Sequence, residues 1–144
     1  EIPTAVTQSV LTALLPNLRK LALPGLGDVA QVQAASLRVL GQLALSDAPE
    51  ANQAAGVLRE VIESHAAHHV LLLAASLYST VPSSHRGSQP VFDRLLAHSD
   101  RWVRLQTLTM VGDAAARSLL SSGALAKAAQ DNDGFVREAA QRLK

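Results

Sequence analysis

The chain has 144 residues, a length typical of one domain, and its formal net charge of +1 gives no overall attraction to nucleic acid or to an anionic membrane. Hydrophobic residues make up 48% of the sequence but aromatic residues only 3%, so Ala and Leu supply most of the apolar content. That composition favours helices packed through small side chains rather than strands. The absence of Cys excludes disulfides, a thiolate zinc site and a Cys nucleophile.

The apolar runs are short. The longest, HVLLLAASLYSTV at positions 69–81, ends well before the roughly 20 apolar residues that a membrane-spanning helix needs. The first residues, EIPTAVTQS, lack the basic segment of a signal peptide. Because the sequence begins with Glu1 rather than Met, we expect a fragment of a longer chain. We also expect the protein to be cytoplasmic or nuclear.

Proline, glycine and polar runs divide the chain into helix-sized segments. The first predicted helix covers residues 4–23, with a kink at Pro16, and Asp28 in the following turn can cap the next helix. The later predicted helices cover residues 29–45, 50–64, 65–81, 91–98, 99–115, 116–123, 124–130 and 134–144. The sequence PSSHRGSQP, residues 82–90, is predicted to be a loop. The sequence therefore predicts an all-α fold.

Alternate helices resemble one another. Four segments can be aligned with one another, and they begin at Gln33, Leu73, Arg104 and Arg137. The segments that begin at Gln33 and Leu73 share the string AASL. The repeat length is then about 31–40 residues, and helical hairpins that repeat at this interval are typical of a helical solenoid. The sequence thus predicts about four hairpins in a single helical-repeat domain, residues 1–144.

The last repeat contains a recognisable motif. It is written Asp131-x-Asp133-x-x-Val136-Arg137-x-x-Ala140-x-x-Leu143, and residues 98–111 hold a weaker copy, Asp100-x-x-Val103-Arg104. This pattern resembles the end of a HEAT repeat, from the HEAT/armadillo superfamily. The resemblance implies a right-handed α-solenoid that binds other proteins along a concave face. It also implies structural roles: Asp100 and Asp133 cap helices, while Arg104 and Arg137 reach the Asp of a neighbouring hairpin.

The overlay predicts the core. Residues at the same position of the aligned segments form a column. Three columns are expected to be buried: Val32, Leu72, Val103 and Val136; Leu37, Leu77 and Leu108; and Val39, Ser79, Met110 and Leu143. A column of small residues is expected to let neighbouring helices approach closely: Ser36, Ser76, Thr107 and Ala140.

One polar register is the candidate binding surface. Arg38, Tyr78, Thr109 and Arg142 share a position on successive helices, so we expect an exposed stripe that binds a partner; the alternative is an ordinary solvated helix face. Trp102, whose column contains Phe135, is a further candidate. A Trp at a helix start can pack between repeats, but if exposed it would anchor a partner.

Catalytic and metal-binding patterns are scarce. His65, His68 and His69 have the spacing of one helix face and are the nearest approach to a zinc site, although no carboxylate or Cys stands at ligand spacing beside them. The alternative is a polar helix start. No nucleophile triad, phosphate-binding loop or paired-carboxylate motif occurs in the sequence. We therefore expect no catalytic residue, no cofactor and no enzyme activity.

These observations favour a non-catalytic scaffold that binds a protein or peptide along its stacked helices. A nucleic-acid-binding HEAT-like module is the main alternative, since residues 81–144 carry nine Lys or Arg against six Asp or Glu. The interleaved acidic residues make that alternative less favourable. A purely structural or assembly segment of a larger protein is the third possibility.

Two further segments could mediate contacts. The apolar residues Ala5, Val6, Val10 and Leu11 suggest self-association through the first helix. The loop of residues 82–90 could be a phosphorylation site or a partner contact at Ser84 or Ser88; the alternative is a solvated linker.

Overall fold

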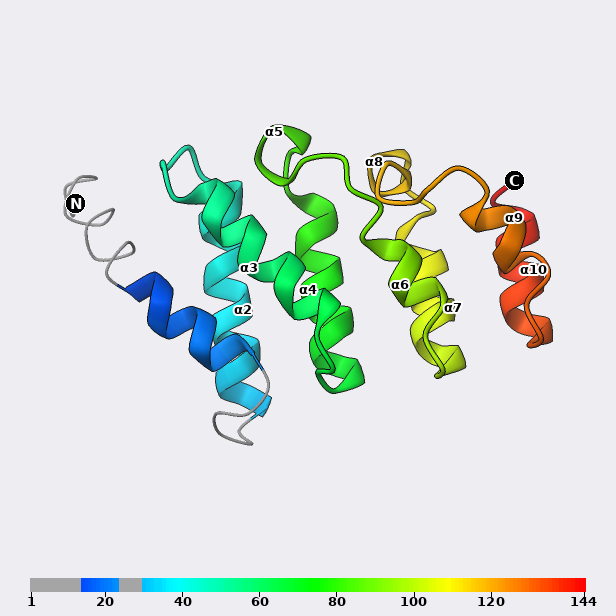
Figure 1. Ribbon diagram of the computed structural model, residues 1–144, viewed down its shortest axis with the longest axis horizontal. Coiled ribbons are helices and arrows are strands. Elements are labelled where there is room, and N and C mark those ends of the chain that lie inside the picture. Colours follow the sequence, from blue (N-terminus) through cyan, green and yellow to red (C-terminus); the bar gives the residue numbers. More distant parts are fainter. Residues whose placement is uncertain (1–13, 24–29) are drawn as a thin grey trace. The chain divides into compact units, whose positions relative to one another are not determined.

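The computed structural model describes residues 14–23 and 30–144, and in this part of the chain the regular structure is helical, with no strand (Figure 1). The all-α prediction is confirmed to that extent. The chain divides into two compact units, Glu1–Arg86 and Gly87–Lys144. The single domain and the solenoid remain predictions. The predicted cap at Asp28 and the predicted contact surface at Ala5, Val6, Val10 and Leu11 lie outside the described residues.

In the first unit the long helices pack against one another. Residues 14–22 are helical, followed by α2 (Ala30–Leu45), α3 (Ala51–Glu63), α4 (His68–Thr80) and the short α5 (Ser83–Arg86). Helix α3 packs on both α2 and α4, which also contact each other (Figure 1). Arg19 Nε donates to Glu60 Oε2 at 2.9 Å, which ties the 14–22 helix to α3.

Small side chains allow this close packing. A Cβ at Gly41 would lie 2.9 Å from Leu77 Cδ2, so α2 and α4 approach at a distance that only glycine allows without a shift. Ala44, Ala54 and Ala74 are fully buried. The core of this unit is therefore built mainly from Ala and Leu, as the composition predicted.

Serine side chains close the ends of α2 and α3. Ser46 Oγ donates to Leu43 O at 2.7 Å and accepts the Ala48 N–H at 3.2 Å. Ser64 makes the matching pair of bonds to Val61 O and Ala66 N–H. These bonds satisfy a carbonyl at the helix end and a donor in the following turn.

Part of the predicted 82–90 loop is helical and packed. Residues 83–86 form α5, which contacts α3. Tyr78 Oη donates to Arg86 O at 3.0 Å, and the Arg86 side chain is buried. His85 Nδ1 in turn lies 2.9 Å from Ala44 O, at the end of α2. This segment therefore closes one end of the first unit, and Ser84 and Ser88 are exposed beside it.

The second unit is built from shorter helices. They are α6 (Phe92–Leu96), α7 (Arg101–Met110), α8 (Ala114–Arg117), α9 (Ala124–Ala128) and α10 (Gly134–Arg142). Helix α7 packs on α6 and α10, and α9 packs on α10 and α6. Asp100, Asp113 and Asp133 each cap a helix by accepting a backbone N–H two residues ahead. The predicted helix of residues 99–115 is split because the cap at Asp113 starts α8.

The buried positions recur from helix to helix with one spacing, which we call the buried register. Helix α2 buries Leu37, Leu40, Gly41 and Ala44, and α4 buries Leu71, Ala74, Ala75 and Tyr78 at the same relative spacing. Arg104, Thr107, Leu108 and Val111 repeat that spacing in α7 and the residue after it. In α10, Val136 and Ala140 repeat the spacing of Val103 and Thr107.

The buried register pairs Leu37 with Leu71, so the predicted overlay of Gln33 on Leu73 was wrong, and it misplaced several side chains. Val32 and Val39 are exposed, with relative exposures of 41% and 39%, although both were expected in the core. Ser76 is exposed, although it was aligned with the buried Ser36. By contrast Val103, Val136 and Leu108 are buried as predicted.

Candidate partner-binding site

The predicted stripe is not a set of exposed residues. Tyr78 has a relative exposure of 1% and is a core residue of the first unit, so its assignment to an exposed binding surface was wrong. Burial raises the pKa of its hydroxyl, which donates to Arg86 O. Arg38, Thr109 and Arg142 are exposed, but Arg38 belongs to the first unit and the other two to the second.

The second unit instead has an exposed aromatic pair. Trp102 in the first turn of α7 and Phe135 in the first turn of α10 have relative exposures of 58% and 68%. They hold equivalent positions, since each stands immediately before the buried Val of its helix. The two side chains line one hollow of about 430 Å³, together with Arg101, Leu105, Glu138, Ala139 and Arg142. We call this set of residues the aromatic hollow.

The Asp caps are the reason that both rings point outward. Asp100 Oδ1 accepts the Trp102 N–H at 2.7 Å, and Asp133 Oδ1 accepts the Phe135 N–H at 2.9 Å. Each cap fixes the first turn of its helix. The buried positions Val103 and Val136 then face the core, and the residue immediately before each of them faces solvent.

The charges around the aromatic hollow are largely paired. The Arg101 guanidinium lies over the Trp102 ring, 5.2 Å from its centroid, and its Nη1 is 3.5 Å from Asp133 Oδ2. Arg142 forms an ion pair with Glu138 one turn earlier in α10. The hollow therefore offers an apolar floor with two arginines and one glutamate at its rim. This arrangement suits an apolar side chain with a polar neighbour.

The capping N–H groups also act on Asp133 itself. The Val136 N–H, followed by that of Phe135 and the Arg101 guanidinium, lowers the pKa of the Asp133 carboxyl below its usual value. The ionised form is thus the one that holds both α10 and the rim of the hollow in place.

The predicted repeat-motif residues lie in loops and at helix ends. Arg104 Nη1 donates to His98 O at 2.8 Å and Ser99 O at 3.0 Å, while its Nη2 donates to Asp131 Oδ1 at 3.0 Å. Its partner in the next hairpin is therefore Asp131, rather than the capping residue Asp133. Arg137 donates to the equivalent carbonyls, Asp131 O at 2.7 Å and Asn132 O at 3.0 Å.

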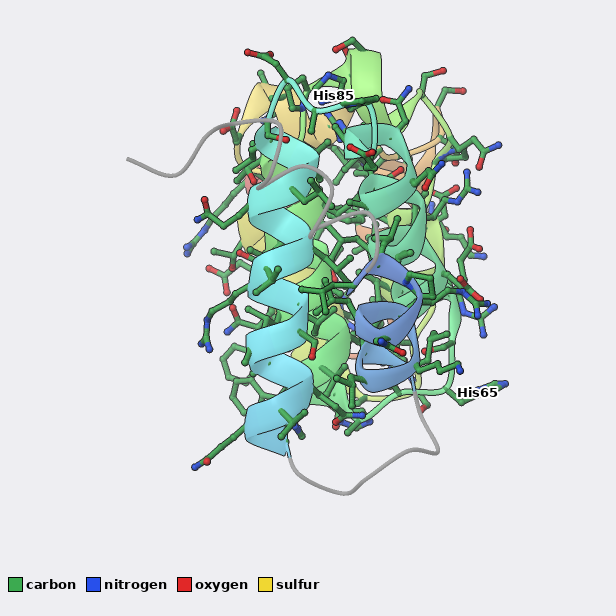
Figure 2. The ribbon with its side chains drawn as sticks, turned by 90° about the vertical axis from the view of Figure 1, so that its left-hand side faces the viewer. His65 and His85 are labelled. Atoms are coloured by element: carbon green, nitrogen blue, oxygen red, sulfur yellow. The ribbon has the colours of Figure 1, made fainter. Side chains whose placement is uncertain are left out.

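The histidine cluster lies at the α3–α4 turn. His65, His68 and His69 are all exposed, and Figure 2 shows His65 projecting from the end of the first unit opposite His85. No group of three His, Asp or Glu side chains that could hold a metal ion occurs within the described residues. The structure therefore does not assemble these histidines into a ligand set there.

A larger hollow of about 760 Å³ lies between α6, α9 and the loop before α9, with Asp93, His98 and Lys127 among its lining residues. Several of its polar groups hold the loops together. Asp93 Oδ1 accepts the Ser121 N–H at 3.0 Å, and His98 Nδ1 accepts the Asp100 N–H at 3.0 Å. Since these groups already serve the fold, we assign no chemistry to this hollow.

Sequence reasoning missed four members of the aromatic hollow: Arg101, Leu105, Glu138 and Ala139. Trp102 and Arg142 were among the predicted binding residues, and Phe135 was named only as sharing the column of Trp102. The signal was present in the overlay of α7 on α10, which aligns Leu105 with Glu138 and Thr109 with Arg142.

No family model, no curated protein and no solved structure matches the chain. Among the described residues, no helix is both long enough and apolar enough to cross a membrane.

Proposed function

We propose that this chain is a non-catalytic protein-interaction module that binds a partner protein or peptide at the aromatic hollow. The observation that supports the proposal is the exposure of Trp102 and Phe135 at equivalent helix positions around one apolar depression. Large aromatic side chains are rarely left in solvent in pairs, and they are the residues that most often anchor interfaces. We further propose that the helices stack as a HEAT-like right-handed solenoid of about four hairpins; the recurrence of the buried register in α2, α4 and α7 supports this.

The occupant that fits is an amphipathic segment of a partner protein. An apolar side chain such as Leu would enter between the two rings. An acidic residue next to it would meet Arg101 and Arg142, whose present partners are Asp133 and Glu138. Nucleic acid fits less well, because phosphate binding requires a denser set of cations than the two arginines at this rim. The proposed location, cytoplasmic or nuclear, stays a prediction.

Trp102 makes the proposal directly testable, since it is the one tryptophan in the sequence. A nuclease-treated lysate would be passed over wild type and over a Trp102→Ala, Phe135→Ala variant, and proteins retained only by wild type would be identified and purified. Titration of such a protein into the full chain should shift Trp102 fluorescence to shorter wavelength, because the ring loses its contact with water. The double variant should bind more weakly by roughly 30-fold or more.

The matched control is a Val39→Ala, Leu45→Ala variant, which removes two exposed apolar side chains of the first unit. It should bind as wild type does. Equal loss in both variants would mean that binding is non-specific, and partner binding without a change in Trp102 fluorescence would place the interface elsewhere. Retention that disappears with nuclease would favour the nucleic-acid alternative.

A further inference from the structure

The larger hollow of the second unit contains one acidic and one basic side chain that lack an ion-pair partner. Asp93 in α6 and Lys127 in α9 both line this hollow of about 760 Å³, which we call the α6–α9 hollow. Within the described residues, neither forms an ion pair with the other or with a third residue. Helices α6 and α9 contact each other, so both walls of the hollow belong to one unit.

The other titratable side chains of the α6–α9 hollow add no net charge. Arg104 and Asp131 form an ion pair, in which Arg104 Nη2 donates to Asp131 Oδ1 at 3.0 Å. His98 accepts the Asp100 N–H through Nδ1, which the neutral imidazole can do and the imidazolium cannot. The hollow therefore has one unpaired negative charge on the α6 side and one unpaired positive charge on the α9 side.

The fold uses one oxygen of Asp93 and leaves the other free. Oδ1 accepts the Ser121 N–H at 3.0 Å, and Oδ2 accepts no hydrogen bond from a described residue. The lining also contains the hydroxyls of Ser121 and Ser122 and the amide of Gln130, and these side-chain groups form no hydrogen bond within the described part of the chain. Each of them can both donate and accept, which is what a peptide group requires of its surroundings.

We propose that the α6–α9 hollow binds a short peptide with free ends, whose ammonium group meets Asp93 Oδ2 and whose carboxylate meets Lys127 Nζ. The argument is charge complementarity: a zwitterion meets an opposite charge on each wall, whereas a purely anionic or cationic ligand would meet one like charge. The volume is in the range of small-ligand sites, about 300–1,000 Å³. The proposal concerns binding alone and assigns no reaction to the hollow.

This site does not rest on the proposed function. The α6–α9 hollow and the aromatic hollow share no lining residue. They also differ in chemistry, since the aromatic hollow has an apolar floor and the α6–α9 hollow has free polar groups. A ligand of one hollow is therefore expected to leave the other unoccupied.

The test titrates the full ¹⁵N-labelled chain with alanylalanine and follows the backbone amide resonances of Ser122 and Gly123. The N-acetyl form of this dipeptide lacks the ammonium group, and its C-terminal amide form lacks the carboxylate. We expect saturable shifts with alanylalanine and about tenfold weaker binding of each blocked form. The indole N–H resonance of Trp102, in the aromatic hollow, should not move.

Two variants assign the charges. Asp93→Asn keeps an oxygen for the Ser121 N–H but loses the charge, so it should lose the preference for alanylalanine over its N-acetyl form. Lys127→Gln should likewise lose the preference over the amide form. The matched control is Arg94→Gln, which removes an exposed cation of α6 that does not line the hollow, and it should keep both preferences.

The opposite results would overturn the proposal. Without a saturable shift of these amides, the hollow does not bind the dipeptide; with equal affinity for the free and blocked forms, the two charges play no part. Tighter binding of phosphoethanolamine than of alanylalanine would make this a site for a phosphate headgroup. Equal losses in Lys127→Gln and Arg94→Gln would mean diffuse attraction. The peptide comparison uses wild type, so a folding defect in a variant does not affect it, and failure here leaves the fluorescence test of Trp102 untouched.

Discussion

The two units bury equivalent helix positions but stabilise their loops by different means. In α2 and α4 the buried register is made of Leu, Ala, Gly and Tyr78, and serine turns end α2 and α3. In α7 and α10 aspartates cap the helix starts, and Arg104 occupies the register position that Leu37 and Leu71 hold in the first unit. The comparison shows that one packing scheme accepts either an apolar or an ionic residue, provided that the ionic one finds partners.

The largest expected effect comes from the apolar unit. Tyr78→Ala should lower the free energy of unfolding by about 3–5 kcal/mol, since it removes a fully buried aromatic ring from the core beside α5. Tyr78→Phe keeps the ring and loses the hydroxyl bond to Arg86 O, so it should cost only about 1 kcal/mol. Urea unfolding, with hydrogen exchange of the α3 and α4 amides as a local probe, measures both. Equal losses in the two variants would mean that the hydroxyl bond, rather than the ring, holds this end of the unit.

Two serines of the first unit test whether the buried register between α2 and α4 is correct. Ser36→Lys should be strongly destabilising because Ser36 is buried, with a relative exposure of 4%, whereas Ser76→Lys should change stability by less than about 0.5 kcal/mol. The overlay of Gln33 on Leu73 would make the two variants equivalent. Equal unfolding midpoints for Ser36→Lys and Ser76→Lys would therefore support that overlay and contradict the buried register between α2 and α4.

The ionic unit should respond to loss of a carboxylate. Asp131→Asn leaves Arg104, whose side chain is only 10% exposed, without its counter-charge, and we expect a loss of about 2 kcal/mol in unfolding free energy. Glu138→Gln breaks the exposed pair with Arg142 and should cost less than about 0.5 kcal/mol. If the two variants unfold at the same denaturant concentration, the Arg104–Asp131 pair contributes no more than a surface ion pair does.

The sequence predicted the ionic unit better than the apolar one, for a physical reason. The spacing of Asp100 and Arg104, repeated in Asp133 and Arg137, fixes both a helix start and a helix phase, so Val103 and Val136 were placed correctly. Helix α4 contains the run VLLLAASL, in which apolar residues occupy every side of the helix. Such a run does not indicate which side of the helix is buried. The shared AASL string therefore aligned matching residue types but not the buried faces of α2 and α4.

The candidate site was only partly predictable for a related reason. Trp102 follows a recognisable cap, which made its exposure one of two open alternatives. Its relation to Leu105 and Glu138 depends on how α7 packs on α10; the overlay aligns these positions in the two helices but does not show that the helices pack together there. Tyr78 was misassigned because the overlay of Gln33 on Leu73 aligned it with the exposed Arg38, whereas the buried register aligns it with the buried Ala44. Its hydroxyl donates to a buried carbonyl at Arg86.

The cap of α10 should make the second unit sensitive to acid. Because the pKa of Asp133 is lowered in the folded state, its contribution to stability is present above the unfolded pKa of about 3.9 and is lost as pH falls through the lower folded value. Wild type should therefore lose stability more steeply than Asp133→Asn as pH falls below about 4, since Asn still caps but does not titrate. Urea midpoints at several pH values measure the two slopes, and parallel curves would contradict the assignment.

The smallest expected effect concerns the start of the same helix, where α7 has Arg101 and α10 has Gly134. The backbone at Gly134 does not require glycine, and a Cβ there would meet only Arg137 Nη2, at 3.6 Å. Gly134→Ala should therefore stabilise the chain by about 0.5 kcal/mol, because the unfolded chain with alanine has less conformational freedom to lose on folding. Gly123, with φ of 93° at the start of α9, is the matched contrast, and its replacement by Ala should be destabilising. Thermal unfolding of the two variants should move in opposite directions; a shift of the same sign would show that the start of α10 needs its glycine, and with it the orientation of Arg137.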